Sequence, residues 1–199
     1  MRIIGLTGGI GSGKSTAAGF LAKMGAVVVG LDKAGHDVLK QREIREKLVS
    51  EFGTEILGNN GEIDRSRFGK KVFNDRKALK KLNNIVHPAI DEVVRDKTEE
   101  YRRQGIKVVV FEAAAMLDAG RDWQVDEVWV TVAPEEMVLK RLSGRQGFTE
   151  ADVKARIRSQ ITNEERIRQA DLVIVNDGTL EGLRERIKTE WEKLQERLK

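Results

Sequence analysis

A short run of residues near the start of the chain has the spacing of a phosphate-binding loop. Residues 8–15 read Gly-Gly-Ile-Gly-Ser-Gly-Lys-Ser, which fits the pattern G-x-x-x-x-G-K-[ST]. Glycine allows the backbone to turn its N–H groups inward around an anion, and the lysine ammonium adds a positive charge. This order of residue types is therefore suited to holding a polyphosphate.

The residues on either side of this loop support the same interpretation. An apolar run at 3–7 precedes it, as expected of a buried strand, and small residues and leucine follow at 15–22, as expected of a helix. Strand, loop and helix in this order are the setting in which the motif binds a nucleoside triphosphate, whereas an ordinary glycine-rich turn would not require these flanks. The lysine then reaches the β- and γ-phosphates, and the hydroxyl beside it holds Mg²⁺. We therefore expect ATP and Mg²⁺ to be bound by Gly8, Gly9, Gly11, Ser12, Gly13, Lys14, Ser15 and Thr16.

The elements that must position this loop can be seen in the hydrophobic pattern. Short runs rich in valine and isoleucine recur at 3–7, 26–29, 107–111, 127–132 and 172–175. None alternates cleanly with polar residues, so we expect strands buried on both faces of a parallel sheet that helices cover. The pattern predicts an α/β fold with a doubly wound, five-stranded parallel sheet.

The stretch between the second and third predicted strands has no strand signal and is too long for an ordinary crossover. Within it, residues 37–52, 65–73 and 75–103 look helical, and Pro88 is expected to break or bend the last of these. We predict a single domain over 1–199 in which residues 37–104 form a helical, substrate-binding insertion at the ligand-binding edge of the sheet.

Among proteins with a phosphate loop, the remaining features favour a small-molecule kinase. A GTPase would need a guanine-reading Asn-Lys-x-Asp, which does not occur, and 199 residues are too few for a large motor ATPase. A kinase must also provide a carboxylate near the acceptor hydroxyl, ligands for Mg²⁺, cationic groups over the transferred phosphoryl group and a lid that excludes water.

Two carboxylates end predicted strands and are candidates for these roles. Asp32 follows the second strand, where it could accept the proton of the acceptor hydroxyl or orient it; its alternative role is to cap the helix at 34–39. Glu112 ends the third strand, the usual position of an acid that organises Mg²⁺, and its alternative role is to cap the segment 113–117.

A mobile lid is expected over residues 141–160. The segment 144–148 carries two glycines between helical stretches, which suits a hinge. Cationic residues surround it, namely Lys140, Arg141, Arg145, Arg156, Arg158 and Arg166. Most should be ordinary charges on helix surfaces, but Arg141 and Arg145 flank the hinge, so we expect these two to neutralise the phosphoryl group in transfer.

Composition limits the partners. The net charge of +4 comes from basic residues interleaved with acidic ones, as Glu181 and Arg184 show, so nucleic acid is not an expected partner. No apolar run reaches the roughly 18 residues of a membrane span, and the first strand runs straight into the loop without a signal peptide. The absence of cysteine excludes disulfides and fits a cytoplasmic location. We expect a cytoplasmic enzyme, a monomer or a small homo-oligomer, that does not bind membranes.

Nearly the whole chain resembles the dephospho-coenzyme A kinase family. The resemblance rests on segments in the family's order and spacing: Ile4–Thr16, Gly25–Asp32, Glu62–Arg65, Val72-Phe73, His87–Ile90, Arg141, Gln160, Arg166, Ala170-Asp171 and Asn176–Gly178. It implies a phosphate-loop kinase fold with a helical insertion and a lid. It also implies transfer of the ATP γ-phosphoryl group to the ribose 3′-hydroxyl of dephospho-CoA, giving CoA and ADP.

The resemblance also implies roles for single residues. Asp32 falls on the family's catalytic aspartate. Arg65, His87 and Gln160 are expected to bind the substrate, with His87 held outside helical geometry by Pro88. Asn176 is expected near the ATP adenine.

Two departures from the family pattern concern the metal and the pocket. Gly30 stands where the family usually has a first aspartate, and Glu-Ala-Ala-Ala-Met-Leu at 112–117 replaces the more common Asp-x-Pro-Leu-Leu. The alternatives are a kinase of the same architecture for shikimate, gluconate or AMP, and a nucleotide-binding regulatory module without acceptor turnover.

Overall fold

The chain folds as two units, which the computed structural model describes over residues 1–73, 75–117, 124–143 and 149–199. Unit 1 combines Met1–Gly30 with Tyr101–Lys199, and unit 2 is Leu31–Glu100. No helix in the described ranges has an apolar stretch of the length and hydropathy needed to cross a membrane.

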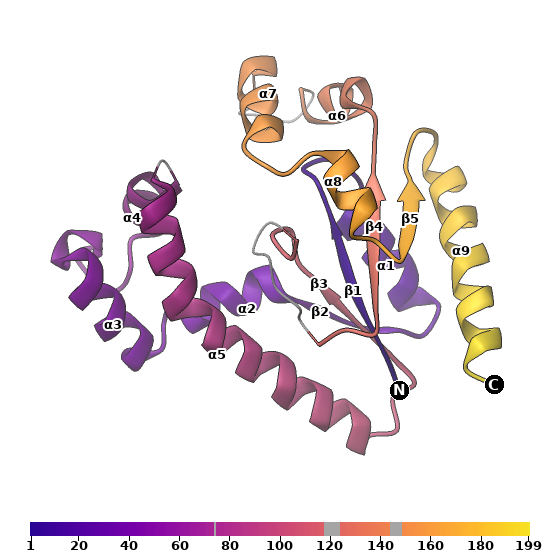
Figure 1. The fold of residues 1–199 in the computed structure, drawn as a ribbon, viewed down its shortest axis with the longest axis horizontal. Helices are drawn as coiled ribbons and strands as arrows, with labels where there is room; N and C mark the ends of the chain where they lie inside the picture. The colour runs from indigo at the N-terminus through magenta and orange to yellow at the C-terminus, as the bar shows by residue number, and fades with distance from the viewer. Residues whose placement is uncertain (74, 118–123, 144–148) are drawn as a thin grey trace. The chain divides into compact units, whose positions relative to one another are not determined.

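Unit 1 is built on a parallel sheet whose strands, in the described part of the chain, are β1 (Arg2–Gly8), β2 (Val27–Gly30), β3 (Val108–Glu112), β4 (Glu127–Val132) and β5 (Leu172–Val175). Their order is β2-β3-β1-β4-β5 (Figure 1). In register, Leu6 of β1 lies between Glu112 of β3 and Trp129 of β4. The phosphate loop therefore leaves the sheet from the middle of its carboxyl edge, where ligands bind in folds of this class. The predicted fold class is confirmed, and each predicted strand agrees with an observed one to within one residue at either end.

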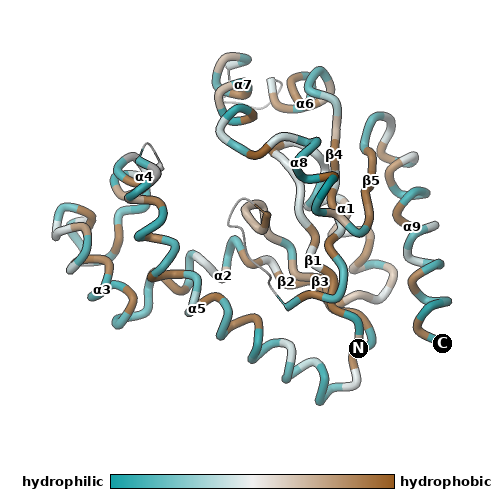
Figure 2. The backbone as a smooth tube through the Cα atoms, in the orientation of Figure 1, coloured by the Kyte–Doolittle hydropathy of each residue, from teal (hydrophilic) through white to brown (hydrophobic). Residues whose placement is uncertain are grey.

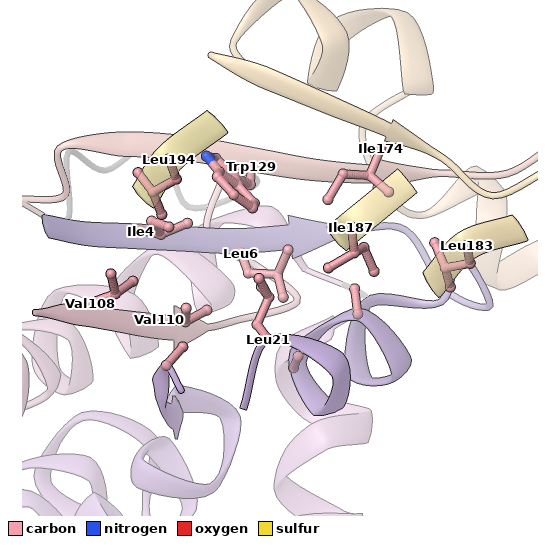
Figure 3. Packing of buried hydrophobic residues seen from close by; sticks show 13 residues of the cluster. Ile4, Leu6, Leu21, Val108, Val110, Trp129, Ile174, Leu183, Ile187 and Leu194 are labelled. Carbon is pink, nitrogen blue, oxygen red and sulfur yellow. The ribbon is translucent and has the colours of Figure 1, made fainter. Parts of the chain in front are cut away.

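The core of unit 1 fixes the helix that follows the phosphate loop. The helices of this unit within the described ranges are α1 (Lys14–Lys23), α6 (Glu135–Leu142), α7 (Glu150–Arg158), α8 (Asn163–Arg168) and α9 (Leu180–Arg197), together with the end of α5. Leu21 of α1 and Ile187 of α9 share one buried cluster with Leu6 and Trp129 of the sheet, and all four are 0% exposed (Figure 3). Hydrophobic colouring runs along β4 and β5, whereas α9 alternates between apolar and polar residues (Figure 2). Burial of one helix face against the strands thus holds α1 in place.

Unit 2 is helical over the ranges predicted to be helical, but the single helix predicted over 37–52 is interrupted between two observed helices. Its helices in the described part of the chain are α2 (Leu31–Val38), α3 (Arg42–Phe52), α4 (Arg65–Phe73) and α5 (Arg76–Arg103), with a 3-10 turn, η1 (Thr54–Ile56). The expected helix over 37–52 stops at Val38, because the N–H groups of Lys40 and Gln41 bond to carbonyls three residues back and close a turn. The rings of Phe52 and Phe68 then pack edge to face at 5.0 Å between centroids.

The break predicted at Pro88 does not occur. Helix α5 runs through Pro88 without a break, so His87 is helical and does not lie in a turn. Proline removes one N–H group from the helix ladder. Against that loss, α5 buries Val86, Ile90 and Val94, which are spaced four residues apart on one face and are each 6–8% exposed. Burial of this apolar face therefore outweighs the preference of proline, and of the residue before it, for a non-helical backbone.

We expect Leu21→Ala to destabilise the protein by about 2–5 kcal/mol, since it would leave a cavity beside the sheet. Leu180→Ala is the matched control, because Leu180 is 64% exposed at the start of α9, and its cost should stay below about 0.5 kcal/mol. Urea unfolding midpoints measure both, and equal midpoints for the two variants would contradict this account of the core.

Candidate functional site

The phosphate loop joins β1 to α1 in a conformation that requires glycine at two positions. Gly11 has φ of 69° and Gly13 has φ of 95°, both in the left-handed region. A Cβ on Gly11 would lie 2.8 Å from Val138, too close for a side chain without rearrangement. Gly13 is also the N-cap of α1, whose first turn carries no acidic residue. The positive end of the helix is therefore available to an anion.

One carboxylate oxygen joins the two loop side chains that were expected to serve phosphate and metal. The Lys14 ammonium donates to Glu112 Oε1 at 2.7 Å, and the Ser15 hydroxyl donates to the same oxygen at 2.7 Å. The Lys14 and Glu112 side chains are only 12% and 16% exposed, so water screens this ion pair weakly. Glu112 reaches both partners because it ends β3 directly beside β1.

These residues fit a magnesium ion that is bound mainly by nucleotide oxygens. A hydroxyl and a carboxylate are oxygen ligands of the kind that Mg²⁺ prefers. Within the described residues no three His, Cys, Asp or Glu side chains gather as a metal cluster. Magnesium ordinarily keeps few protein ligands and takes others from substrate phosphates, which agrees with a site consisting of Ser15 and Glu112.

Two side chains from distant parts of unit 1 hold the start of the loop. The hydroxyls of Ser12 and Thr131 lie 2.7 Å apart and are both buried. Gln160 accepts a hydrogen bond from the N–H of Ile10 through Oε1 at 3.0 Å. Gln160, expected to bind the substrate, thus contacts the phosphate loop.

Arg141 and Asn176 contact the next two carbonyls of the loop. Arg141 donates from Nη1 to the carbonyl of Gly11 at 3.2 Å, and the Asn176 amide donates to the carbonyl of Ser12 at 2.8 Å. The two side chains also bond to each other, Arg141 Nη2 to Asn176 Oδ1, at 2.9 Å. Asn176 is 6% exposed. The structure therefore brings together the loop and three of the residues singled out from the sequence.

A cavity of about 620 Å³ in unit 1 opens beside the loop. Its lining includes Gly9 and Ser12 of the loop, Val138 of α6, and Arg158 and Arg166 from the segments around α7 and α8. Arg166 is only 3% exposed, so it is not one of the ordinary surface charges that most of these cationic residues were expected to be. A Cβ on Gly9 would come within 3.1 Å of the Arg166 guanidinium, so the absence of a side chain there gives the guanidinium room.

Unit 2 contains a separate pocket with a cationic lining. It measures about 540 Å³ and is lined by Lys33, His36, Asp37, Leu39, Lys40, Asn60, Glu62, Ile63 and Arg65. Arg65 donates from Nη2 to His36 Nε2 at 2.7 Å, since a guanidinium can only donate. Three of these side chains, Lys33, Lys40 and Arg65, are cationic, against two carboxylates.

The other two residues expected at the acceptor site lie elsewhere in unit 2. Asp32 is exposed in the first turn of α2, inside the helix and not at its N-cap. His87 is half-buried on α5 and is not part of the pocket lining. Arg145 and the segment 144–148 fall outside the described residues.

Thr131 and His36 are not among the site residues predicted from the sequence. Thr131 is the one polar residue inside the apolar run 128–132, and that exception was a usable signal. His36 is one of only two histidines and follows Asp32 by four residues, one helical turn further along α2.

Comparisons with known proteins agree with this arrangement. The family model described as dephospho-CoA kinase matches residues 2–182. A dephospho-CoA kinase from Dehalococcoides mccartyi is 41% identical over 184 residues, covering 92% of this chain and 93% of that protein. The crystal structure of TT1252 from Thermus thermophilus is 32% identical, covers 97% of both chains and has a TM-score of 0.81. The structure of dephospho-CoA kinase from Campylobacter jejuni is 27% identical, covers 98% of both chains and has a TM-score of 0.72. This chain therefore belongs to the dephospho-CoA kinase family.

Proposed function

We propose that this protein transfers the γ-phosphoryl group of ATP to the ribose 3′-hydroxyl of dephospho-CoA, giving CoA and ADP. Family membership over nearly the whole chain is the observation that carries the reaction. The complete phosphate loop, with Lys14 and Ser15 at its end, supports ATP as the donor.

In this proposal the loop and α1 bind the donor. The backbone N–H groups and the positive end of α1 hold the β-phosphate, and Lys14 exchanges Glu112 for phosphate oxygens. Ser15 and Glu112 would hold Mg²⁺, which when bound offsets negative charge on the β- and γ-phosphate oxygens. Water exclusion is the task of the lid region 141–160.

The acceptor belongs to unit 2 in this proposal. Dephospho-CoA carries a pyrophosphate, and the pocket beside Arg65 offers it Lys33, Lys40 and His36 as partners. Asp32 orients the 3′-hydroxyl and takes its proton as the oxygen forms its bond to the γ-phosphorus. The bond from that phosphorus to the β,γ-bridging oxygen breaks at the same centre, and its electron pair leaves with ADP.

The direct test measures ADP release with ATP and Mg²⁺ in the presence of dephospho-CoA, AMP, shikimate, gluconate or no acceptor. We expect turnover with dephospho-CoA alone, and none in Lys14→Ala at unchanged circular dichroism. Turnover with another acceptor would replace the proposed substrate, and full activity of the lysine variant would remove the phosphate loop from the reaction.

Asp32→Asn should lower kcat by roughly 10²-fold or more while the KM for ATP changes little, because amide replacement removes the proton acceptor without touching the donor loop. Asp96→Asn is the control, since Asp96 is an exposed carboxylate of the same unit on α5. Steady-state kinetics with ATP varied at saturating dephospho-CoA give kcat and the KM for ATP of both variants. Near-normal turnover of Asp32→Asn would take this residue out of the chemistry.

Glu112→Gln should have opposite effects on nucleotide binding without metal and on turnover with it. Neutralising Glu112 releases Lys14 from its ion pair, so ATP should bind about ten-fold more tightly in EDTA, given the usual strength of charge-assisted hydrogen bonds. Turnover with Mg²⁺ should fall about ten-fold, since a ligand of the ion is lost. Calorimetric titration with and without Mg²⁺ measures the first effect. An unchanged affinity in EDTA would show that Glu112 does not compete with phosphate for Lys14.

A further inference from the structure

Two successive peptide groups of the phosphate loop are oriented by side chains from far along the chain. The carbonyl of Gly11 accepts from Arg141, and the carbonyl of Ser12 accepts from Asn176. In a trans peptide the C=O of one residue and the N–H of the next point in opposite directions. A donor that fixes the carbonyl of Ser12 on one side therefore turns the N–H of Gly13 to the other side.

The same argument applies to the preceding peptide. With its carbonyl held by Arg141, the Gly11–Ser12 peptide turns the N–H of Ser12 away, and this N–H closes a turn on the carbonyl of Gly9 at 3.2 Å. Together the two bonds set the curvature of the loop and the direction of an N–H at the start of α1.

Neither side chain can rotate independently of the other. Arg141 Nη2 donates both to Asn176 Oδ1 at 2.9 Å and to the Asn176 carbonyl at 3.1 Å. Because Oδ1 faces the guanidinium, the amide nitrogen must face Ser12. The backbone of Asn176 is fixed in turn, since its N–H extends the sheet ladder to the carbonyl of Val132 at 2.7 Å. A continuous set of hydrogen bonds therefore runs from the sheet to the loop.

We infer that Arg141 and Asn176 are positioning residues, which act on ATP through the phosphate loop and not through the adenine or the transferred phosphoryl group. This role rests on the proposed function of the loop as the polyphosphate site. Asn176 is buried, and both polar groups of its amide bond within the protein. Among the described residues, the Nη atoms of Arg141 donate three hydrogen bonds. These go to the carbonyls of Gly11 and Asn176 and to the amide oxygen of Asn176.

The test compares a ligand that has a nucleoside with one that has none. Dissociation constants for Mg²⁺-ADP and for Mg²⁺-tripolyphosphate are measured by calorimetry in the wild type, Asn176→Ala and Arg141→Lys. Lysine keeps the charge, but its single ammonium cannot reproduce donation from two separate guanidinium nitrogens. We expect both variants to bind both ligands about ten-fold more weakly, by the same factor for each ligand, as follows from the loss of a hydrogen bond to a buried carbonyl.

Arg186→Ala is the matched control. Arg186 also donates to a carbonyl at the end of β5, that of Val175, and pairs with Asp177, but its bonds do not involve the loop. Its affinities should equal those of the wild type. Melting temperatures without ligand identify a variant that fails to fold. If Asn176→Ala does not fold, the conservative variant Arg141→Lys still tests the inference.

The remaining outcomes overturn the inference. Weaker ADP binding with unchanged tripolyphosphate binding would mean that the two residues contact the nucleoside. Wild-type affinity of both folded variants for both ligands would mean that the hydrogen bonds do not position the loop. If the wild type itself bound neither ligand, the proposed function would fail, and the inference would fall with it.

Discussion

A backbone segment that turns N–H groups toward an anion must find hydrogen-bond donors for the carbonyls that face the other way, because buried carbonyls without partners are costly. Two side chains of unit 1 meet this requirement, since Arg141 of α6 and Asn176 after β5 donate to the carbonyls of Gly11 and Ser12. Two others hold the loop by other groups: Thr131 of β4 bonds the Ser12 hydroxyl, and Gln160 accepts from the N–H of Ile10. The carboxyl end of the sheet therefore carries the phosphate loop and also fixes its conformation through hydrogen bonds.

The sequence predicts the parts of this structure that depend on local chemistry. The loop motif and the valine-rich strands can be predicted from the sequence because glycine geometry and strand burial depend on a few neighbouring residues. The hydrogen bond from Asn176 to Ser12 could not be predicted from local pattern, because it joins residues 164 positions apart, and the burial of Arg166 could not because it depends on tertiary packing. The break predicted at Pro88 did not occur for a related reason. Burial of the apolar face of α5 outweighed the preference of proline for a non-helical preceding residue.

Unit 2 was predictable as a helical region, but its pocket was not. The lack of strand signals showed where the helical unit lies, and the family resemblance pointed to Arg65. The partner of Arg65 could not be found by spacing, because His36 precedes it by 29 residues and belongs to another helix. His87 shows the reverse. The His87–Ile90 segment resembles a family signature, but none of its side chains lines the pocket of unit 2.

The distances in sequence between the loop and its supports bear on how the protein becomes functional during synthesis. Strand β1 and the loop are made before the residues that hold the loop, which lie at 131, 141, 160 and 176. Both sheet neighbours of β1 are also made later, after the whole of unit 2. Such non-local pairing is slow to form. A nascent chain would therefore carry the phosphate-loop motif without being able to use it until residues 131 to 176 had been made, and nucleotide could stabilise the fold only after that point.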